Sequence, residues 1–281
     1  MLNQSIPEIT LNDGTTIPVI GLGTYGLNGN DGANAIKGAI DIGYRLIDTA
    51  YNYENEGTVG EAVRRSTIPR EELRITSKLP GRYQKYDQAL TTIQESLYRA
   101  NLAYYDLYLI HWPNPIQDDY VEAWQALIEA KKQGLIRSIG VCNFLPEHIE
   151  RLDKETGVKP SINQIELHPF FNQEVQRKWH EENNVQTQSW SPIARANIVL
   201  ENETIRKIAE HHDKSVSQVI LRWHYQLGAV PIPKSASPER QLENISIFDF
   251  TLDDEEMNLI AVLTRPDGRN KNQDPAVYEE F

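Results

Sequence analysis

Short apolar runs alternate with longer amphipathic segments along most of the chain. Each run has the length of a buried strand and is bounded by turn residues. In chain order the runs are VIGLGT (19–24), RLIDTA (45–50), LRITSKL (73–79), YDLYLIHW (105–112), IRSIGVCNF (136–144), INQIELH (162–168), VQTQSWS (185–191) and AVPIPKS (229–235). Between them lie segments with apolar residues at helical spacing, such as 87–102 and 118–135. The pattern therefore predicts strands and helices in regular alternation.

This alternation predicts an α/β fold in which helices cover a parallel sheet. About eight strand–helix units in roughly 250 residues fit a (β/α)8 TIM barrel. An Asp13-Gly14 turn between ITL and TTIPV predicts an N-terminal β-hairpin before the barrel. The C-terminal tail is expected near the barrel mouth. We find no linker or low-complexity tract, so residues 1–281 are expected to form a single domain.

A doubly wound sheet is the main alternative fold. The segment from Gly21 to Gly26 has G-x-G-x-x-G spacing, which in that fold opens the helix that binds a dinucleotide. That fold also requires an acidic strand end about 20 residues later. Asp41 and Asp48 are both candidates by distance, but neither stands clearly at the expected place. The barrel is therefore the better prediction.

Composition and charge narrow the possible partners. Hydrophobic residues make up 40% of the 281 residues and charged residues 24%, which is typical of a globular protein with a sizeable core. The formal net charge is −12. Because phosphate binding requires clustered Lys and Arg, this charge argues against nucleic acid as a partner.

The cysteine count and the N-terminus bear on the cell compartment. Cys142 is the only cysteine, so an intrachain disulfide is impossible and a reducing compartment is indicated. The N-terminal segment MLNQSIPEIT lacks the basic and apolar regions of a signal peptide. No segment approaches the roughly 18 consecutive apolar residues of a spanning helix. We expect a cytoplasmic monomer that does not associate with a membrane.

Polar side chains stand at the carboxyl ends of the predicted strands, the end that forms the active site of such barrels. Taken singly, each has an ordinary structural explanation, such as a capping carboxylate, a surface lysine or a buried histidine. Asp48, Tyr53, Lys78 and His111 differ because they follow three consecutive strands and should converge on one mouth. The full set is Thr24 and Tyr25, Asp48 with Tyr53, Lys78, His111 with Trp112, Cys142 with Asn143, Gln164 with Glu166 and His168, Trp190 with Ser191, and Lys234 with Ser235.

These four side chains together suit proton transfer to a substrate. A tyrosine ordinarily titrates near pH 10. The Lys78 ammonium favours the tyrosinate, so we expect it to lower the pKa of Tyr53 and make the phenol a better acid. Asp48 is expected to hold Lys78 in place inside a dry cavity. His111 would be a neutral hydrogen-bond donor.

Two other enzyme classes fit less well. A hydrolytic barrel would use paired carboxylates, and Glu166 has no second carboxylate at a facing strand end. A metal hydrolase would need clustered ligands, whereas His111 and His168 lie on different strands without an H-x-H or H-E-x-x-H motif. We therefore expect no metal.

Three long segments resemble the signatures of the aldo-keto reductase family. They are GYRLIDTAYNYENEGTVG (43–60), LIEAKKQGLIRSIGVCNF (127–144) and IPKSASPERQLENISI (232–247). The likeness covers nearly the whole chain and is nearest to bacterial members that act on small aldehydes, dicarbonyls and keto sugars. It implies NADPH-dependent reduction of a small carbonyl substrate to an alcohol. The alternative is a protein on the same barrel that binds the cofactor without turnover.

The resemblance also implies roles for individual residues. The catalytic residues would be Asp48, Tyr53, Lys78 and His111, with Tyr53 as proton donor and His111 orienting the carbonyl. Tyr25, Tyr53, His111 and Trp112 would contact the substrate. The residues implied to bind NADPH or NADP⁺ are Thr24, Tyr25, Asp48, Cys142, Asn143, Gln164, Trp190, Ser191, Pro192, Ile193, Arg195, Lys234, Ser235, Arg240, Glu243 and Asn244.

Within that set the resemblance gives each region of the cofactor its own contacts. Trp190 would stack on the nicotinamide, and Asn143 and Gln164 would bind its carboxamide. The adenosine 2′-phosphate would lie against Lys234, Ser235 and Arg240, with Glu243 and Asn244 beside the adenine. Arg195 would act near the pyrophosphate, in a loop that lacks the glycines common in relatives.

Some positions depart from the family pattern. Cys142 stands where serine is common, so that carboxamide contact is weakened and a packing role is expected. Pro80 and Gly81 replace an aromatic wall, which predicts an open site that favours small or polar carbonyls. The alternative is a mouth closed by Trp112 with the tail aromatics Tyr278 and Phe281.

Overall fold

The computed structural model describes residues 6–194 and 198–281. Within them, eight parallel strands stand side by side in the order β10-β9-β8-β7-β6-β5-β4-β3, so each strand pairs with the strand before it in the chain. This order is that of a barrel, whereas a doubly wound sheet reverses its strand order in the middle. The strands are β3 (Leu22–Gly23), β4 (Leu46–Asp48), β5 (Arg74–Leu79), β6 (Tyr105–Ile110), β7 (Ile136–Cys142), β8 (Ile162–Glu166), β9 (Gln186–Trp190) and β10 (Val230–Pro231).

Backbone contacts between the first and last strands close the barrel. The amide of Gly21 donates to the carbonyl of Pro231 at 3.0 Å, and that of Gly23 donates to Pro233 at 3.0 Å. Gly23 also forms a parallel bridge with Lys234. The predicted (β/α)8 barrel is thereby confirmed, and the dinucleotide interpretation of the Gly21–Gly26 segment is wrong because Gly21 and Gly23 serve this seam.

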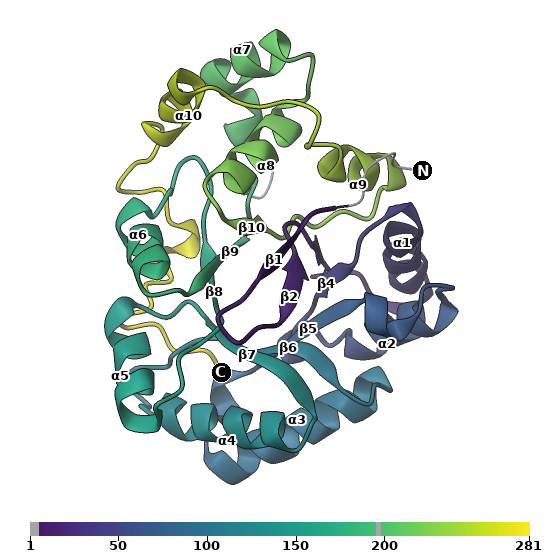
Figure 1. Cartoon of the computed structure of the whole chain (residues 1–281), viewed down its shortest axis with the longest axis vertical. Coiled ribbons are helices and arrows are strands. Elements are labelled where there is room, and N and C mark those ends of the chain that lie inside the picture. The colour runs from purple at the N-terminus through teal and green to yellow at the C-terminus, as the bar shows by residue number, and fades with distance from the viewer. Residues whose placement is uncertain (1–5, 195–197) are drawn as a thin grey trace.

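Helices surround the strands as an outer ring (Figure 1). In α3, Ala89, Ile93, Leu97 and Ala100 recur every three or four residues and are buried against the strands. The helices of the described residues are α1 (Gly29–Ile42), α2 (Glu56–Arg65), α3 (Tyr86–Ala100), α4 (Tyr120–Lys132), α5 (Pro146–Thr156), α6 (Glu174–Glu182), α7 (Glu203–His211), α8 (Val216–Gln226), α9 (Pro238–Ile245) and α10 (Asp254–Ala261).

Successive side chains of a strand point alternately into the barrel and toward the helices. In β6, Leu107 and Leu109 belong to the interior cluster, whereas Tyr108 and Ile110 pack against the helices. The interior is therefore a packed core rather than a pore.

The predicted hairpin is present and covers one end of the barrel. Strands β1 (Glu8–Thr10) and β2 (Thr16–Pro18) pair antiparallel and lie across the centre of the ring in Figure 1. The turn uses Gly14, whose φ of 82° lies in the left-handed region that suits glycine. Leu11 and Ile17 join the interior cluster of the barrel. The hairpin closes the amino-terminal end, which leaves the carboxyl ends of the strands for the site.

The C-terminal tail crosses the opposite end and closes part of the mouth. The Tyr278 ring packs on Trp112 with centroids 4.4 Å apart. The Asn114 side chain donates to the Glu280 carbonyl at 2.9 Å and accepts from its backbone amide at 3.0 Å. Phe281 remains 81% exposed and covers nothing. The open mouth expected from Pro80-Gly81 is therefore wrong on this side, because the tail fills the place of the missing aromatic.

Gly81 explains why the tail can pack so closely. A Cβ at this position would lie 2.3 Å from the side-chain nitrogen of Asn114 and 2.4 Å from the carbonyl of Glu280. Only glycine leaves that space for the tail backbone.

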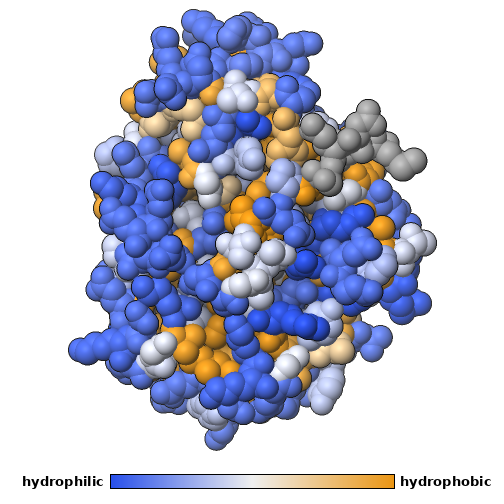
Figure 2. All heavy atoms as spheres, in the orientation of Figure 1, coloured by the Kyte–Doolittle hydropathy of each residue, from blue (hydrophilic) through white to orange (hydrophobic). Residues whose placement is uncertain are grey.

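Hydrophilic residues dominate the face drawn in Figure 2, and apolar residues appear there in separate groups. Among the described helices, none has the length and apolar character required to cross a membrane.

Candidate active site

The four predicted catalytic residues converge at the carboxyl ends of β4, β5 and β6. Asp48 ends β4, Lys78 lies near the end of β5, and His111 directly follows β6. Tyr53 ends the short 3₁₀ helix η1 (Tyr51–Tyr53) after β4. The His111 backbone amide donates to the carbonyl of Leu79 at 3.0 Å, so its position continues the β5–β6 register.

Lys78 and Asp48 form a buried ion pair behind the cavity. The Lys78 Nζ lies 2.6 Å from Oδ1 of Asp48 and donates to the Thr49 carbonyl at 2.8 Å. The Lys78 side chain is fully buried. Burial alone would lower the pKa of Lys78, but Asp48 outweighs it and raises that pKa above its usual range. The expected pairing of Asp48 with Lys78 is thus present, and the ammonium is stably charged.

Tyr53 lies between this pair and the cavity. Its ring centroid is 5.2 Å from Lys78 Nζ and 6.0 Å from the ring of His111. Burial raises the pKa of Tyr53 to about 12, although the Lys78 charge lowers it. The expectation that Lys78 lowers the pKa of Tyr53 below 10 is therefore wrong for the protein without cofactor or substrate. The loss of solvation of the phenolate raises this pKa by more than the Lys78 charge lowers it.

A cavity of about 590 Å³ opens in front of these groups. Its volume falls within the usual range for cofactor and small-molecule sites. Eleven of the implied cofactor residues line it: Thr24, Tyr25, Asp48, Cys142, Asn143, Gln164, Trp190, Ser191, Pro192, Ile193 and Lys234. All four implied substrate contacts line it as well: Tyr25, Tyr53, His111 and Trp112.

Gln164 is oriented by its neighbours. Its amide nitrogen donates to Oδ2 of Asp48 at 2.8 Å and to Oε1 of Gln188 at 2.7 Å. An amide has two N–H donors, so both are engaged. The carbonyl oxygen is left to accept from a ligand in the cavity, with only the Cys142 thiol near it at 3.9 Å. Gln164 thus suits an N–H donor such as a carboxamide.

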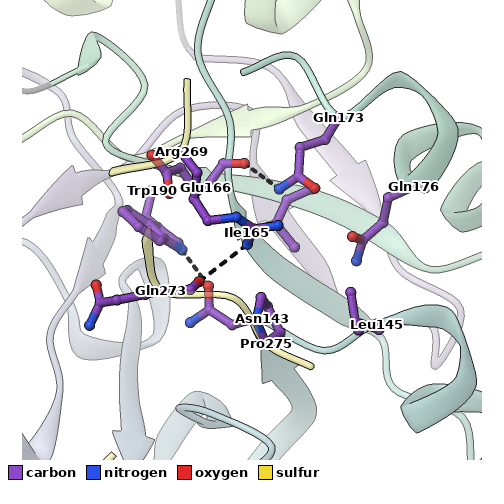
Figure 3. A pocket seen from close by; sticks show the side chains of 10 residues that line it. All are labelled: Asn143, Leu145, Ile165, Glu166, Gln173, Gln176, Trp190, Arg269, Gln273 and Pro275. Atoms are coloured by element: carbon purple, nitrogen blue, oxygen red, sulfur yellow. Dashed lines mark hydrogen bonds between the residues drawn. The ribbon is translucent and has the colours of Figure 1, made fainter. Parts of the chain in front are cut away.

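Asn143 is more fully engaged within the protein. Its Oδ1 accepts from the indole N–H of Trp190 at 2.7 Å, a contact drawn in Figure 3. Its Nδ2 donates to the His111 carbonyl at 3.1 Å. The backbone of Asn143 has a φ of 62°, in the left-handed region that asparagine tolerates. The visible role of Asn143 is therefore to orient Trp190, while its predicted carboxamide contact stays a prediction.

Figure 3 also shows a second, much smaller cavity beside Asn143 and Trp190. Its volume is about 10 Å³, roughly one water. Arg269 and Gln273 of the tail line it together with Glu166 of β8. Glu166 accepts from the Asn270 amide at 2.7 Å and pairs with His168 at 3.0 Å. Glu166 is thus occupied in holding the tail, which removes the basis for a hydrolytic role.

Cys142 is buried in the barrel interior, where it also lines the cavity. Burial raises the pKa of its thiol well above the usual range, although Lys78 lowers it. The thiolate is therefore disfavoured, which agrees with the predicted packing role.

The region implied to hold the 2′-phosphate lies around the start of α9. Lys234 and Arg240 are exposed, and no hydrogen bond or ion pair within the described residues engages either side chain. Ser235 is instead buried, and its hydroxyl accepts from the Ser237 amide at 3.1 Å. Ser235, Arg240, Glu243 and Asn244 do not line the 590 Å³ cavity.

Glu243 and Asn244 face the protein rather than the solvent. The Glu243 carboxylate accepts from the hydroxyl of Ser215, which caps α8. Asn244 is buried near Tyr44. Their predicted adenine contacts stay predictions. Arg195 lies outside the described residues.

Four residues at the mouth were not predicted: Asn52, Lys271, Gln273 and Glu280 all line the cavity. Asn52 stands inside the first signature, directly between Tyr51 and Tyr53, but its amide belongs to no recognised catalytic or binding motif. The other three lie in a tail without periodicity or motif, and only the folded structure brings them to the strand ends.

One group of side chains outside the cavity has the composition of a possible metal site, although the sequence predicted no metal. His211, His212 and Glu256 bring three possible ligand atoms within 4.8 Å of one another. They join α7 to α10 through His–Glu contacts of 2.8–2.9 Å. None of the three lines the cavity.

The fold and the site together define a barrel with a tyrosine, a lysine–aspartate pair and a histidine around one cavity. The family model of the aldo/keto reductase family matches residues 19–264. The chain belongs to the aldo/keto reductase family.

Named relatives cover the chain from end to end. It is 47% identical over 277 residues to 2,5-diketo-D-gluconic acid reductase B of Corynebacterium sp., covering 99% of both chains. It is 44% identical over 276 residues to methylglyoxal reductase DkgA of Escherichia coli, covering 98% of both. A mutant of Gox0644 in complex with NADPH superposes with a TM-score of 0.93 at 43% identity, over 98% of this chain and 100% of the other. A Bombyx mori aldo-keto reductase in complex with NADP gives 0.90 at 34% identity, over 99% of both.

Proposed function

We propose that this protein reduces small aldehydes and ketones to alcohols with NADPH. The observation that carries the proposal is the convergence of Tyr53, His111 and the Lys78–Asp48 pair at the 590 Å³ cavity. Named reductases that match the chain over nearly its whole length support it.

When bound, NADPH supplies the hydride that adds to the carbonyl carbon. Tyr53 donates a proton to the carbonyl oxygen. Lys78 stabilises the tyrosinate that remains, because its ammonium lies 5.2 Å from the ring and is fixed by Asp48. His111 faces the same cavity and donates a hydrogen bond that orients the carbonyl.

The residues around the cavity fit the cofactor. The Gln164 carbonyl oxygen is available for a carboxamide N–H, and Trp190 borders the same space. Lys234 and Arg240 are exposed cations in an otherwise acidic protein, and neither has an anionic partner among the described residues. Such cations suit a phosphate group, which an arginine binds through a fork of N–H donors.

The preferred substrates are small or polar carbonyls. Two named relatives are reductases of methylglyoxal and of diketogluconic acid. In this chain Trp112 and Tyr278 narrow the mouth, while Asn52, Glu280 and Lys271 give it polar walls. These polar side chains offer hydrogen-bond partners to a small, polar carbonyl substrate, which a purely apolar wall would not.

The first test is a panel of carbonyl substrates with the purified protein. Methylglyoxal, a keto sugar and an aromatic aldehyde should each be assayed by NADPH oxidation. We expect measurable turnover, highest with the small dicarbonyl. If NADPH binds but no carbonyl on a broad panel is reduced, the non-catalytic alternative replaces this proposal.

Arg240→Ala should weaken NADPH binding far more than NADH binding, because only NADPH carries the 2′-phosphate. A hydrogen bond to a charged group contributes about 1.5–3 kcal/mol, or roughly one to two decades in Kd. Fluorescence titration with both cofactors measures the difference. Arg206→Ala is the matched control, since Arg206 is exposed on α7 and, among residues 6–194 and 198–281, its side chain hydrogen-bonds to the Leu200 carbonyl alone. Equal losses for NADPH and NADH in Arg240→Ala would show that Arg240 acts structurally.

We further propose that the protein is a monomer, that it acts in the cytoplasm, and that its partner is a small molecule and not a nucleic acid.

A further inference from the structure

The C-terminal tail brings a second carboxylate to the catalytic groups. Oε1 of Glu280, the penultimate residue, lies 2.8 Å from Nδ1 of His111. Nδ1 of His111 has no hydrogen-bond partner among the described residues and faces the Glu280 oxygen at ion-pair distance, so the two form an ion pair when the ring is protonated. Glu280 is 8% exposed and lines the cavity. A side chain outside every family signature thus touches one of the four predicted catalytic residues.

The tail is fastened so that this contact is built into the fold. The Asn114 side chain makes two hydrogen bonds to the backbone of Glu280: its Nδ2 donates to the carbonyl at 2.9 Å, and its Oδ1 accepts from the amide at 3.0 Å. The neighbouring Glu279 carboxylate accepts from the backbone amide of Ile116 at 2.7 Å. These bonds fix the backbone and leave the Glu280 side chain directed at the catalytic groups.

Donors around the carboxylate hold it in the ionised form. Oε2 accepts from the Gly81 amide at 2.9 Å, and Oε1 accepts from the Asn52 side chain at 2.8 Å. Asn52 is itself oriented by Arg82, which donates to its Oδ1 at 2.7 Å. Burial alone would raise the pKa of Glu280, but His111 and these hydrogen bonds outweigh it and lower that pKa below its usual range.

A buried carboxylate needs a compensating positive charge. The one ion pair that Glu280 makes within residues 6–194 and 198–281 is with His111. Lys78 is already paired with Asp48. Other ionisable groups share this part of the cavity. They are Asp48 at the end of β4, Tyr53 in η1 and Cys142 in β7, with Lys78 in β5 behind them, Lys234 after β10, and Lys271 and Tyr278 of the tail, while Arg82 reaches Glu280 only through Asn52.

We propose that Glu280 is a positioning residue that keeps His111 protonated, with Nδ1 toward the tail and the Nε2–H presented to the substrate oxygen. The inference rests on the proposed reduction. A neutral ring whose proton sits on Nδ1, facing a carboxylate, has an Nε2 that can only accept. Such a ring could not donate to a carbonyl oxygen. The charged ring donates from both nitrogens, so Glu280 makes the orientation of His111 compatible with catalysis.

The charge of the ring also matters for the proton transfer. Hydride addition to a carbonyl places negative charge on the substrate oxygen. A charged donor stabilises that oxygen more strongly than a neutral one does. The tail is therefore part of the reduction chemistry as well as of the substrate wall.

The direct test follows protonation of His111 by NMR of histidine ring ¹³C in the protein without substrate. The chain has seven histidines, and the His111 signal is assigned by its loss in His111→Asn. We expect the His111 ring of Glu280→Gln to lose its proton at a pH lower by about one unit or more than in the wild type. Glu279→Gln is the matched control: it removes the adjacent tail charge without touching His111, and its amide oxygen can still accept from the Ile116 amide, so His111 should titrate as in the wild type.

Kinetics provide the second readout. Glu280→Gln should lower kcat about tenfold or more near pH 8 with little change in KM, because the lost interaction acts on charge that develops in the transition state. Glu280→Asp, which retains the charge, should recover part of the loss, and Glu279→Gln should keep the wild-type pH profile. The proposal is wrong if His111 loses its proton at the same pH in Glu280→Gln and the wild type, or is already neutral at pH 6. The titration needs no turnover, so it remains decisive even if no carbonyl is reduced.

Discussion

Tyr53→Phe is expected to reduce turnover by about 10²–10⁴-fold, the usual contribution of a general acid. The substitution keeps the aromatic ring, which packs at the edge of Tyr25 with centroids 5.2 Å apart, and removes only the hydroxyl. Without that hydroxyl the proposed proton donor to the carbonyl oxygen is missing, while His111 and its hydrogen bond to the same oxygen are retained. Cofactor binding should survive, because the ring and all the other side chains that line the cavity are retained.

Steady-state rates with a small dicarbonyl and a separate titration of NADPH binding measure the two effects. Tyr51→Phe is the matched control. Tyr51 belongs to the same 3₁₀ helix, but its hydroxyl accepts from Arg99 at 2.6 Å and does not line the cavity. A Tyr53→Phe protein that retains most of the wild-type rate would exclude Tyr53 as the proton donor.

The barrel and the four catalytic candidates could be predicted because both follow from local patterns. The end of each predicted strand can be located in the sequence, where the apolar run stops. The carboxyl ends of parallel strands meet on one face of a barrel. Asp48, Lys78 and His111 therefore had to lie close together once the alternation was recognised. The structure places them so, with the Lys78–Asp48 contact at 2.6 Å.

The pKa of Tyr53 could not be predicted in the same way. Sequence identifies the charged neighbour, Lys78, but not how much water reaches the phenol. The two effects oppose each other, and burial is the larger. Only packed coordinates decide which one prevails.

The tail was predictable only in part: the sequence placed it near the barrel mouth and offered its aromatics as a cover, but it did not predict the contact with His111. Glu280 lies 169 positions from His111 in the chain (280 − 111), and no motif links them. Its place depends on Asn114, on the missing side chain of Gly81 and on the Trp112–Tyr278 contact. These are long-range contacts, each ordinary by itself. Composition and periodicity carry no record of such contacts.

Lys78→Met is expected to destabilise the protein strongly as well as to abolish turnover. Removing one partner of a buried ion pair leaves the other charge without compensation, at a cost of about 3–5 kcal/mol in the free energy of unfolding. Here the remaining charge would be Asp48, whose side chain is only 5% exposed. Urea unfolding followed by circular dichroism measures the loss.

A double mutant separates the charge effect from the loss of packing. In Lys78→Met with Asp48→Leu, both charges are gone, so much of the lost stability should return while turnover stays absent. The recovery should be incomplete, because Gln164 loses the Asp48 acceptor at 2.8 Å and the Thr49 carbonyl loses its donor.

The control for this experiment is an ion pair outside the barrel. Lys85 contacts Asp119, but the Lys85 side chain is 55% exposed. The Asp119 side chain is 11% exposed and keeps a hydrogen bond from Gln117 at 2.9 Å, so Lys85→Met should destabilise the protein much less than Lys78→Met does. If Lys78→Met and Lys85→Met unfold at the same urea concentration, the prediction is wrong. Asp48 would then not be left as a buried, unpaired charge in Lys78→Met, because it is protonated or hydrated there. Because the Lys78–Asp48 pair is buried, we expect Lys78→Met to unfold at a much lower urea concentration than Lys85→Met, and the double mutant to recover much of that loss.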